Sequence, residues 1–232
     1  SGVESIKFPK KISKIGLSAF YECTGLKKIE FQENDEKVKD TNGQERLYPL
    51  VLDSSSFYDC TGLEEVILSS NVEKIGDTAF SGCESLKSIN LPEGLKIIGA
   101  CFISGTAIKS LWVPKTVNNV DAFIAYGATG GALDLEEVIF EEGMTKVPKY
   151  FFHDSLKNKK LKLVEIPESV TEISKDAFED CINITIYGYK NSRAESYAIE
   201  NNIPFSALDD EENKHTESNV YFFSQWDAEK QI

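Results

Sequence analysis

Apolar and polar residues alternate in short stretches that return along most of the chain. In "LKSINL" (86–91), apolar residues alternate with polar ones towards the end, and Pro92 follows directly. A period of two predicts a strand with one buried face, and a proline suits the point where no further ladder hydrogen bond is needed. The same arrangement recurs at Leu26/Ile29/Phe31, Leu63/Val66/Leu68, Ile108/Leu111/Val113, Leu135/Val138/Phe140 and Leu161/Val164/Ile166.

A second apolar pair follows each predicted strand, for example Leu95/Ile98 and Val170/Ile173. This spacing predicts a second, shorter extended piece on another side of the same repeat. Segments such as "GDTAF" and "SKDAF" come next, with an Asp or Ser placed to cap about one helical turn. Each repeat thus contains a strand, a short extended piece and a turn.

Aligning the phenylalanines makes the repeat explicit. The clear copies are "IGLSAFYECTGLKKIEF" (15–31), "LDSSSFYDCTGLEEVIL" (52–68), "IGDTAFSGCESLKSINL" (75–91), "IGACFISGTAIKSLWV" (98–113) and "ISKDAFEDCINITI" (173–186). The predicted aromatic column is Phe20, Phe57, Phe80, Phe102, Phe123, Phe152 and Phe178. Spacings of 23, 22 and 21 residues between Phe57, Phe80, Phe102 and Phe123 fall in the range of leucine-rich repeats.

Repeats of this kind form an α/β solenoid, in which the connection between successive strands passes once around a coil, so the strands lie parallel. A single coil cannot bury its apolar face, and stability therefore comes from neighbouring coils. We predict about seven to eight coils, with a parallel sheet on one side and short helical turns on the other.

The five cysteines follow the repeat. Cys23, Cys60, Cys83 and Cys181 each lie three residues after a phenylalanine, and Cys101 directly precedes one. Because free cysteine behaves as a small apolar residue, we interpret them as buried thiols. Cys60 and Cys83 could approach within disulfide distance, but side chains stacked in parallel rarely have the required dihedral angle. The chain has no C-x-x-C motif and only two histidines, so no zinc site is predicted.

Composition and charge exclude several other classes. A net charge of −13 with scattered basic residues argues against a nucleic-acid partner, and no apolar run is long enough to cross a bilayer. The chain contains no H-E-x-x-H, G-x-S-x-G, phosphate-loop or dinucleotide-binding motif. We therefore predict no catalytic residues, no metal and no cofactor.

The pattern I-P-x-x-V-x-x-I-G-x-x-A-F-x-x-C-x-x-L-x-x-I, present here in "VPKTVNNVDAF" and "IPESVTEISKDAFEDC", resembles the BspA-type (Treponema-type) leucine-rich repeat family. The resemblance covers residues 3–186 and implies a right-handed leucine-rich-repeat solenoid from a surface or secreted protein of a bacterium or protozoan. Residues 186–205 resemble the closing element of such arrays, with a short helix across Ser192 to Asn201. The chain opens within a repeat, so we expect further residues to precede it.

Outside residues 3–205, the sequence predicts an acidic linker-like segment (206–219) and an aromatic tail (220–232), which we expect to pack on the solenoid or on another molecule. Insertions at 32–48, 126–134 and 153–160 are expected to form loops at the rim. The acidic cluster at 209–212 is interpreted as solvated linker rather than a calcium site, and the glycosylation sequon Asn183-Ile-Thr185 as a chance match.

Candidate binding residues come from the outward positions of the predicted strands. One column reads Glu30, Ile67, Asn90, Trp112, Ile139 and Glu165, and the other reads Lys28, Glu65, Ser88, Ser110, Glu137 and Leu163. Exposed apolar groups within a polar border are typical of binding centres. The predicted ligand-binding residues are Trp112, Ile67, Asn90, Ile139, Glu65 and Glu137. In an alternative interpretation, the insertions at 32–48 or 124–134 fold over this face and bury Trp112, and the paired carboxylates only support lysines on adjacent strands.

These observations lead to a hypothesis of function. The chain is a non-enzymatic protein-binding or adhesion module of a bacterial cell-surface or secreted protein, with a host matrix protein or mucosal glycoprotein among the possible partners. The first alternative is a structural spacer that presents another domain. A carbohydrate-binding module and an enzyme of glycan processing are more distant alternatives. The sequence leaves the oligomeric state open.

Overall fold

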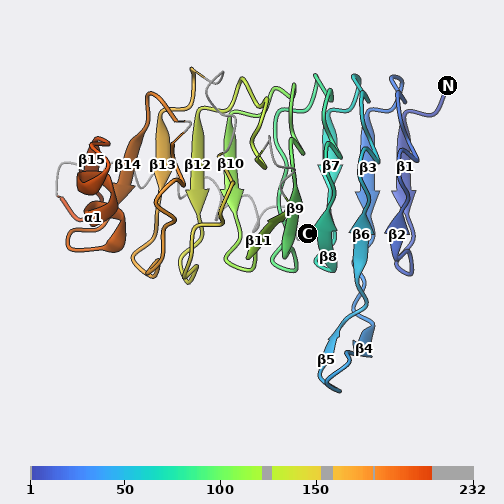
Figure 1. Ribbon diagram of the computed structural model, residues 1–232. Helices are drawn as coiled ribbons and strands as arrows, with labels where there is room; N and C mark the ends of the chain where they lie inside the picture. Colours follow the sequence, from blue (N-terminus) through green and yellow to red (C-terminus); the bar gives the residue numbers. More distant parts are fainter. Residues whose placement is uncertain (1, 122–126, 153–158, 180, 211–232) are drawn as a thin grey trace.

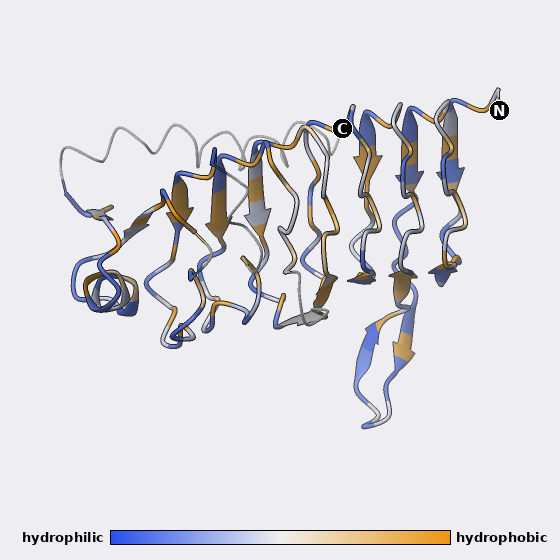
Figure 2. Cartoon of the chain, turned by 45° about the horizontal axis from the view of Figure 1, so that its top comes forward, coloured by the Kyte–Doolittle hydropathy of each residue, from blue (hydrophilic) through white to orange (hydrophobic). Residues whose placement is uncertain are grey.

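The structure, a computed structural model, describes residues 2–121, 127–152, 159–179 and 181–210. The described chain winds as a solenoid of about eight turns, with parallel strands stacked side by side along its length (Figure 1). The predicted leucine-rich-repeat solenoid is confirmed. Hydrophobic segments recur from turn to turn, as expected when every coil contributes to one continuous core (Figure 2).

The first sheet contains the strands predicted from the "L-x-x-I-x-L" pattern, and it is divided in two. Its N-terminal part is β1 (Ser5–Phe8), β3 (Lys28–Phe31) and β7 (Glu65–Ile67). Its C-terminal part is β10 (Ser110–Val113), β12 (Glu137–Phe140), β13 (Leu163–Glu165), β14 (Thr185–Gly188) and β15 (Phe205–Ala207). Every strand pair in both parts is parallel.

The third coil interrupts this sheet. Residues 86–91 form no strand, although Leu86, Ile89 and Leu91 remain buried. The coil that follows is one residue shorter at the equivalent place. Ile108 comes two positions after Thr106, whereas Leu86 of the third coil comes three positions after Cys83. The core therefore continues across the coil while the backbone ladder does not.

The second sheet contains the short extended pieces predicted after each strand. It comprises β2 (Lys14–Ile15), β6 (Leu50–Leu52), β8 (Val72–Ile75), β9 (Ile97–Gly99) and β11 (Asn119–Asp121). A parallel bridge between Lys146 and Glu172 repeats the arrangement further along. These strands lie at the other end of each coil from the first sheet (Figure 1).

Tight turns, rather than the predicted helical turns, connect the second sheet back to the first. Thr78 and Gly82 adopt positive φ values of 51° and 74°, which breaks any helical path. Their N–H groups donate to the next coil, at Ala100 O (2.8 Å) and Ser104 O (2.7 Å). The turns thus extend the ladder between coils, and among the described residues the one α-helix is α1 (Arg193–Glu200).

A glycine follows an isoleucine in several repeats, at Ile15-Gly16, Ile75-Gly76 and Ile98-Gly99, and we call this the "I-G" pair. The close approach of a neighbouring coil's backbone explains the glycine. A Cβ at Gly99 would lie 2.2 Å from Asp77 N, and one at Gly76 would lie 2.5 Å from Ser54 N. At Gly16, in the first described coil, a Cβ would have nothing within 4 Å. Glycine is therefore required where one coil stacks on the turn of the preceding coil.

The aromatic column is confirmed at the N-terminal end. The Phe20 and Phe57 rings stack with centroids 5.1 Å apart, and the Phe57 and Phe80 rings are 5.5 Å apart and nearly parallel. Phe57 and Phe80 are fully buried, and Phe20 packs partly buried at the end of the core.

In the fourth coil, the assignment of Phe102 to the column is wrong by one residue. Phe57 N donates to the carbonyl of Ala79, the residue before Phe80. Phe80 N donates in the same way to Phe102 O, so the residue equivalent to Phe80 is Ile103. Both Phe102 and Ile103 are fully buried, which is why the apolar pattern alone allows either alignment.

Thr129 occupies the equivalent position in the fifth coil, because its N–H donates to Phe151 O, the residue before Phe152. The predicted column member Phe123 lies outside the described residues. The aromatic column resumes beyond this point, where Phe152 contacts Phe178 and Phe178 contacts Tyr197 at centroid distances of 5.0 and 5.6 Å. Ile103 and Thr129 thus separate two aromatic stacks.

All five cysteines are free thiols, and two are fully buried as predicted. Cys60 Sγ donates to Phe20 O at 3.0 Å, and Cys83 Sγ donates to Phe57 O at 3.2 Å. Each buried thiol therefore bonds the carbonyl of the phenylalanine in the preceding coil. Cys23, Cys101 and Cys181 are only half-buried.

The insertion at 32–48 forms an antiparallel hairpin of β4 (Lys37–Lys39) and β5 (Glu45–Leu47), which projects beyond the β6 end of its coil (Figure 1). The predicted closing helix is confirmed as α1, capped by the Ser192 hydroxyl, which accepts from Glu195 N. Tyr197 of α1 donates from its hydroxyl to Lys175 O at 2.9 Å. The helix thereby covers the last coil.

Candidate protein-binding face

The outward face of the first sheet is set by the alternation along its strands. In β10, Leu111 and Val113 are buried, while Ser110 and Trp112 are half-buried and project from the sheet. Since the strands are parallel and in register, outward residues of successive strands form straight rows across the sheet. The rows therefore decide which candidate residues meet.

Trp112 heads one row in the C-terminal part of the sheet. It lies opposite Ile139, which lies opposite Glu165, which in turn lies opposite Tyr187. We call these four residues the aromatic row. The adjacent second row is Ser110, Glu137, Leu163 and Thr185.

Trp112 and Ile139 lie opposite each other on adjacent strands, as predicted, but Ile139 is buried, at 8% exposure, where an exposed apolar group was expected. Two other predicted residues lie elsewhere. Ile67 lies opposite Glu30 in the N-terminal part of the sheet. Asn90 is exposed and belongs to the third coil, which has no strand. Sequence reasoning extends the column from Ile67 through Asn90 to Trp112, whereas the ladder is interrupted there.

The two predicted carboxylates have different environments. Glu65 forms an ion pair with Lys28 of the neighbouring strand at 2.9 Å, as predicted for a purely structural role. Glu137 accepts a hydrogen bond from the Ser110 hydroxyl within the second row. Of the two, Glu137 belongs to the same surface as Trp112.

Tyr187 and Glu165 belong to the aromatic row but were not among the predicted ligand-binding residues. Burial, and then the charge of Glu137, raises the pKa of Glu165. Burial, followed by the charge of Glu165, also raises the pKa of the nearby Tyr189. Tyr187 could have been found from "ITIY" (184–187), where it follows Ile186 as Trp112 follows Leu111.

The described parts of the insertions do not lie over this row. The hairpin of β4 and β5 projects at the β6 end of its coil, where Arg46 binds Glu73 at 2.8 Å (Figure 1). Residues 127–134 belong to the tight turns, where Thr129 is buried against the next coil. The alternative in which these insertions bury Trp112 therefore has no support from the described residues.

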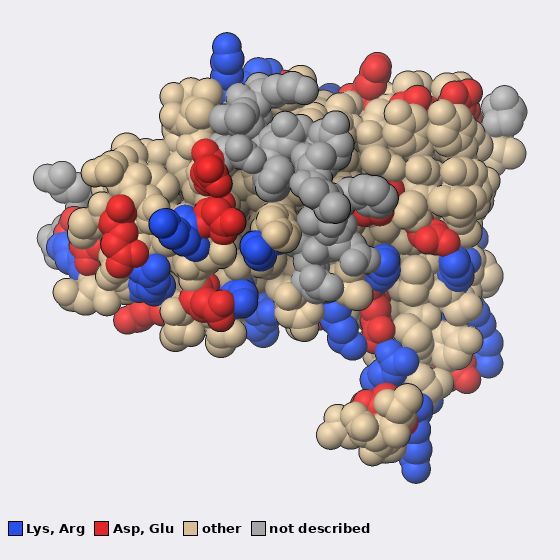
Figure 3. All heavy atoms as spheres, in the orientation of Figure 1, with Lys and Arg blue, Asp and Glu red and all other residues tan. Residues whose placement is uncertain are grey.

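Charged side chains elsewhere are mixed rather than segregated. In the view of Figure 3, basic and acidic groups lie next to one another on the hairpin and along the coils. Many pair between neighbouring coils, as Lys109 does with Glu136 (3.0 Å) and Lys146 with Glu172 (2.6 Å). The scattered distribution of basic residues predicted from the sequence is thus observed.

The described part of the chain was also compared with the geometry of metal sites and membrane spans, and it matches neither. No group of three or more His, Cys, Asp or Glu side chains there could hold a metal ion. None of its helices has the length and apolarity required to cross a bilayer.

The parallel strands, tight turns and closing helix define a leucine-rich-repeat solenoid. A family model described as "BspA type Leucine rich repeat region" matches residues 1–42 and 51–185 in six copies. The chain therefore belongs to the BspA-type leucine-rich repeat family.

Solved structures agree with this fold. The T. pallidum leucine-rich repeat protein TpLRR is 18% identical with a TM-score of 0.50, covering 82% of this chain and 76% of that one. The pneumococcal vaccine antigen PcpA is 23% identical with a TM-score of 0.50, covering 90% of this chain and 55% of that one. No curated protein is significantly similar to the chain.

Proposed function

We propose that this chain is a non-enzymatic protein-binding and adhesion module, and that its partner binds the face formed by β10, β12, β13 and β14. The observation that carries the proposal is the aromatic row, in which the half-buried Trp112 and Tyr187 project from the sheet in register, with the buried Ile139 next to Trp112. Aromatic side chains at the centre of an interface supply most of its binding free energy. Polar groups of the second row supply a rim with hydrogen-bonding capacity.

The carboxylates give the face a preferred kind of partner. Glu137 and Glu165 are adjacent outward acids, and the raised pKa of Glu165 reflects its partial burial and the neighbouring charge. A partner that places a lysine or arginine between them relieves this repulsion. We therefore propose a protein ligand with an apolar patch next to a basic residue, such as a host matrix protein or mucosal glycoprotein.

Family membership supports the proposed location. The resemblance of the repeats to the BspA-type family implies a surface or secreted protein, and one structure of the same fold is of a pneumococcal vaccine antigen. We propose that this chain belongs to a bacterial protein that is displayed on the cell surface or secreted.

The test is a binding measurement against matrix proteins and mucosal glycoproteins with matched variants. Trp112→Ala and Ile139→Ser are each expected to lower the affinity for the partner by about tenfold or more, since removal of a central anchor costs about 1.4 kcal/mol or more. Ile67→Ser is the control, because Ile67 is outward and half-buried, as Trp112 is, but lies in the N-terminal part of the sheet. Circular dichroism confirms that each variant folds.

Two outcomes contradict the proposal. If both row variants bind every tested protein as the parent chain does, a structural spacer accounts for the chain better. If binding is lost on enzymatic removal of the partner's glycans, the face is a carbohydrate-binding module instead.

A further inference from the structure

The last described residues are fixed beside the aromatic row. β15 pairs with β14, and Ser206 lies opposite Tyr187, so that it extends the row by one strand. Leu208 N then donates to Gly188 O at 2.7 Å. Lys190 pairs with Asp210 through its ammonium group and donates from its backbone N–H to Asp209. The chain thus leaves the solenoid at the end of this row.

The chain that follows is long enough to return across the row. From Ser206 to Trp112 the row crosses four strand-to-strand steps, or about 19 Å at about 4.8 Å per step. The nine residues 211–219 can span up to about 30 Å when extended. Residues 220–226 can therefore be placed anywhere along the row.

The chemistry of residues 220–226 matches the row. The segment "VYFFSQW" holds Val220, Tyr221, Phe222, Phe223 and Trp226 in an otherwise acidic and polar stretch. The half-buried rings of Trp112 and Tyr187 in the row are removed further from water when the two surfaces meet. The phenol of Tyr221 and the indole N–H of Trp226 are hydrogen-bond donors, and the row contains a carboxylate that accepts them.

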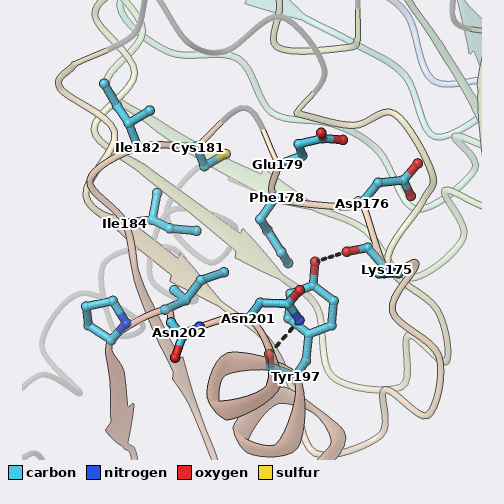
Figure 4. A pocket seen from close by; sticks show the side chains of 12 residues that line it. Lys175, Asp176, Phe178, Glu179, Cys181, Ile182, Ile184, Tyr197, Asn201 and Asn202 are labelled. Carbon is cyan, nitrogen blue, oxygen red and sulfur yellow. Dashed lines mark hydrogen bonds between the residues drawn. The ribbon is translucent and has the colours of Figure 1, made fainter.

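A hollow near the closing helix is an alternative site for residues 220–226, but it fits them less well than the aromatic row does. It has a volume of about 600 Å³ and lies between the last coil and α1 (Figure 4). Its lining combines charged side chains, among them Lys175 and Asp176, with apolar ones such as Phe178 and Ile182, and it opens beside Pro204, before the start of β15. Its place at the end of β15 opposite to the point where the chain leaves the solenoid makes it the poorer site for the segment.

We propose that residues 220–226 bind the aromatic row of their own chain and cover it until a partner displaces them. This inference rests on the proposed function, since it assigns a regulator to the same face. A tethered segment has an effective concentration in the millimolar range, so even weak contacts hold it in place. A partner must then bind the row more tightly than the segment does, which restricts binding to well-matched surfaces.

The test uses the fluorescence of Trp112 in the full chain. The chain has two tryptophans, so Trp226→Phe leaves Trp112 as the sole reporter and keeps the segment aromatic. In this background, Phe222→Ser with Phe223→Ser is expected to cause a several-fold rise in acrylamide quenching of Trp112. Ile232→Ser, outside the segment, is the control and is expected to leave quenching unchanged.

Three results overturn the inference. The first is equal quenching with and without the two serines. The second is quenching that changes with protein concentration, because the cover then comes from another copy. The third is hydroxyl-radical footprinting in which the segment protects Ile182 and Ile203 of the hollow rather than Trp112.

Failure of this inference can be told apart from failure of the proposed function, because quenching needs no partner. If the serine variants expose Trp112 but Trp112→Ala leaves partner binding unchanged, the cover is real and the proposed binding face is wrong. If both hold, the serine variants bind the partner several-fold more tightly than the parent chain.

Discussion

The two parts of the first sheet share one core and differ on their outward faces. In the N-terminal part, outward charges pair between strands, with Lys7 bound to Glu30 at 2.5 Å and Lys28 bound to Glu65 at 2.9 Å. In the C-terminal part, Trp112, Ile139 and Tyr187 take the outward positions. The repeat therefore fixes the inward residues and leaves the outward ones free. Both parts pair outward groups between strands, and the C-terminal part adds the half-buried aromatic side chains of Trp112 and Tyr187.

The core shows a second contrast, between its ends and its middle. Phenylalanine rings stack at both ends, whereas Ile103 and Thr129 occupy the same position in the fourth and fifth coils. The sheet is interrupted in the adjacent third coil. Loss of the regular ladder and loss of the ring stack thus occur in neighbouring coils, where the two parts of the molecule join.

The largest effect is expected from removing a ring of the N-terminal stack. Phe80→Ala should lower the free energy of unfolding by about 3–5 kcal/mol, because Phe80 is fully buried and the cavity stays open between coils. Urea unfolding measures the loss. Native-state hydrogen exchange should show it mainly in β6, β8 and β9, since each coil depends on its neighbours. A loss below about 1 kcal/mol would contradict a packed ring column.

A smaller effect is expected from replacing the glycine of the "I-G" pair by alanine. The effect should be present in a coil that stacks on a preceding one and absent in the first coil. Gly99→Ala places a methyl group 2.2 Å from Asp77 N, so the coils must shift and stability should fall by about 1–3 kcal/mol. Gly16→Ala is the matched control, because nothing lies within 4 Å of its added Cβ. Thermal unfolding of both variants checks the difference, and equal losses would show that backbone approach is not the reason for glycine.

Much of the fold could be predicted from the sequence because each signal is local and repeated. The two strand patterns outside 86–91, the closing helix and the phenylalanine of the N-terminal coils were read correctly. The Phe102 assignment failed because Phe102 and Ile103 are adjacent apolar residues, and hydrogen bonds between coils decide which is equivalent to Phe80. The helical turns were predicted from local capping residues. The chain forms tight turns there instead, because their backbone N–H groups hydrogen-bond to the next coil.

The candidate face was predicted only in part. Trp112 and Ile139 were correctly placed side by side, because strand alternation and the repeat determine both positions. Ile67 and Asn90 were placed with them only by assuming an unbroken sheet. Residues 86–91 form no strand although they show the same alternation as the segments that do, so the alternation alone does not reveal the interruption. Whether these residues bind a partner stays a prediction.

A third prediction concerns the pH dependence of the C-terminal face. Because the folded-state pKa of Glu165 is raised, the folded protein holds this proton more tightly than the unfolded chain does. The resulting stability is fully present below the ordinary value of 4.5 and is lost as pH rises through the folded-state pKa. Glu165→Gln should therefore be more stable than the parent at pH 7, by less than about 1 kcal/mol because the side chain is partly solvated.

Urea unfolding of the parent and Glu165→Gln between pH 4 and 7 measures this difference. The difference in unfolding free energy should shrink as the pH falls and the parent carboxylate is protonated. Glu64→Gln, at an exposed position of the N-terminal part, is the control. A difference that grows toward acid would reverse the sign and contradict a raised pKa.

The smallest effect is expected from the ion pairs of the N-terminal part. Lys28 and Glu65 lie opposite each other on β3 and β7, but their side chains are 37% and 41% exposed. A double-mutant cycle with Lys28→Ala and Glu65→Ala should therefore give a coupling energy of about 0.2–1 kcal/mol that falls with added salt. A coupling above about 2 kcal/mol would show that these pairs hold the coils together as strongly as the core does. A small coupling supports the view that the outward charge pairs of the N-terminal part contribute little to folding, so the repeat can vary its outward residues without loss of the core.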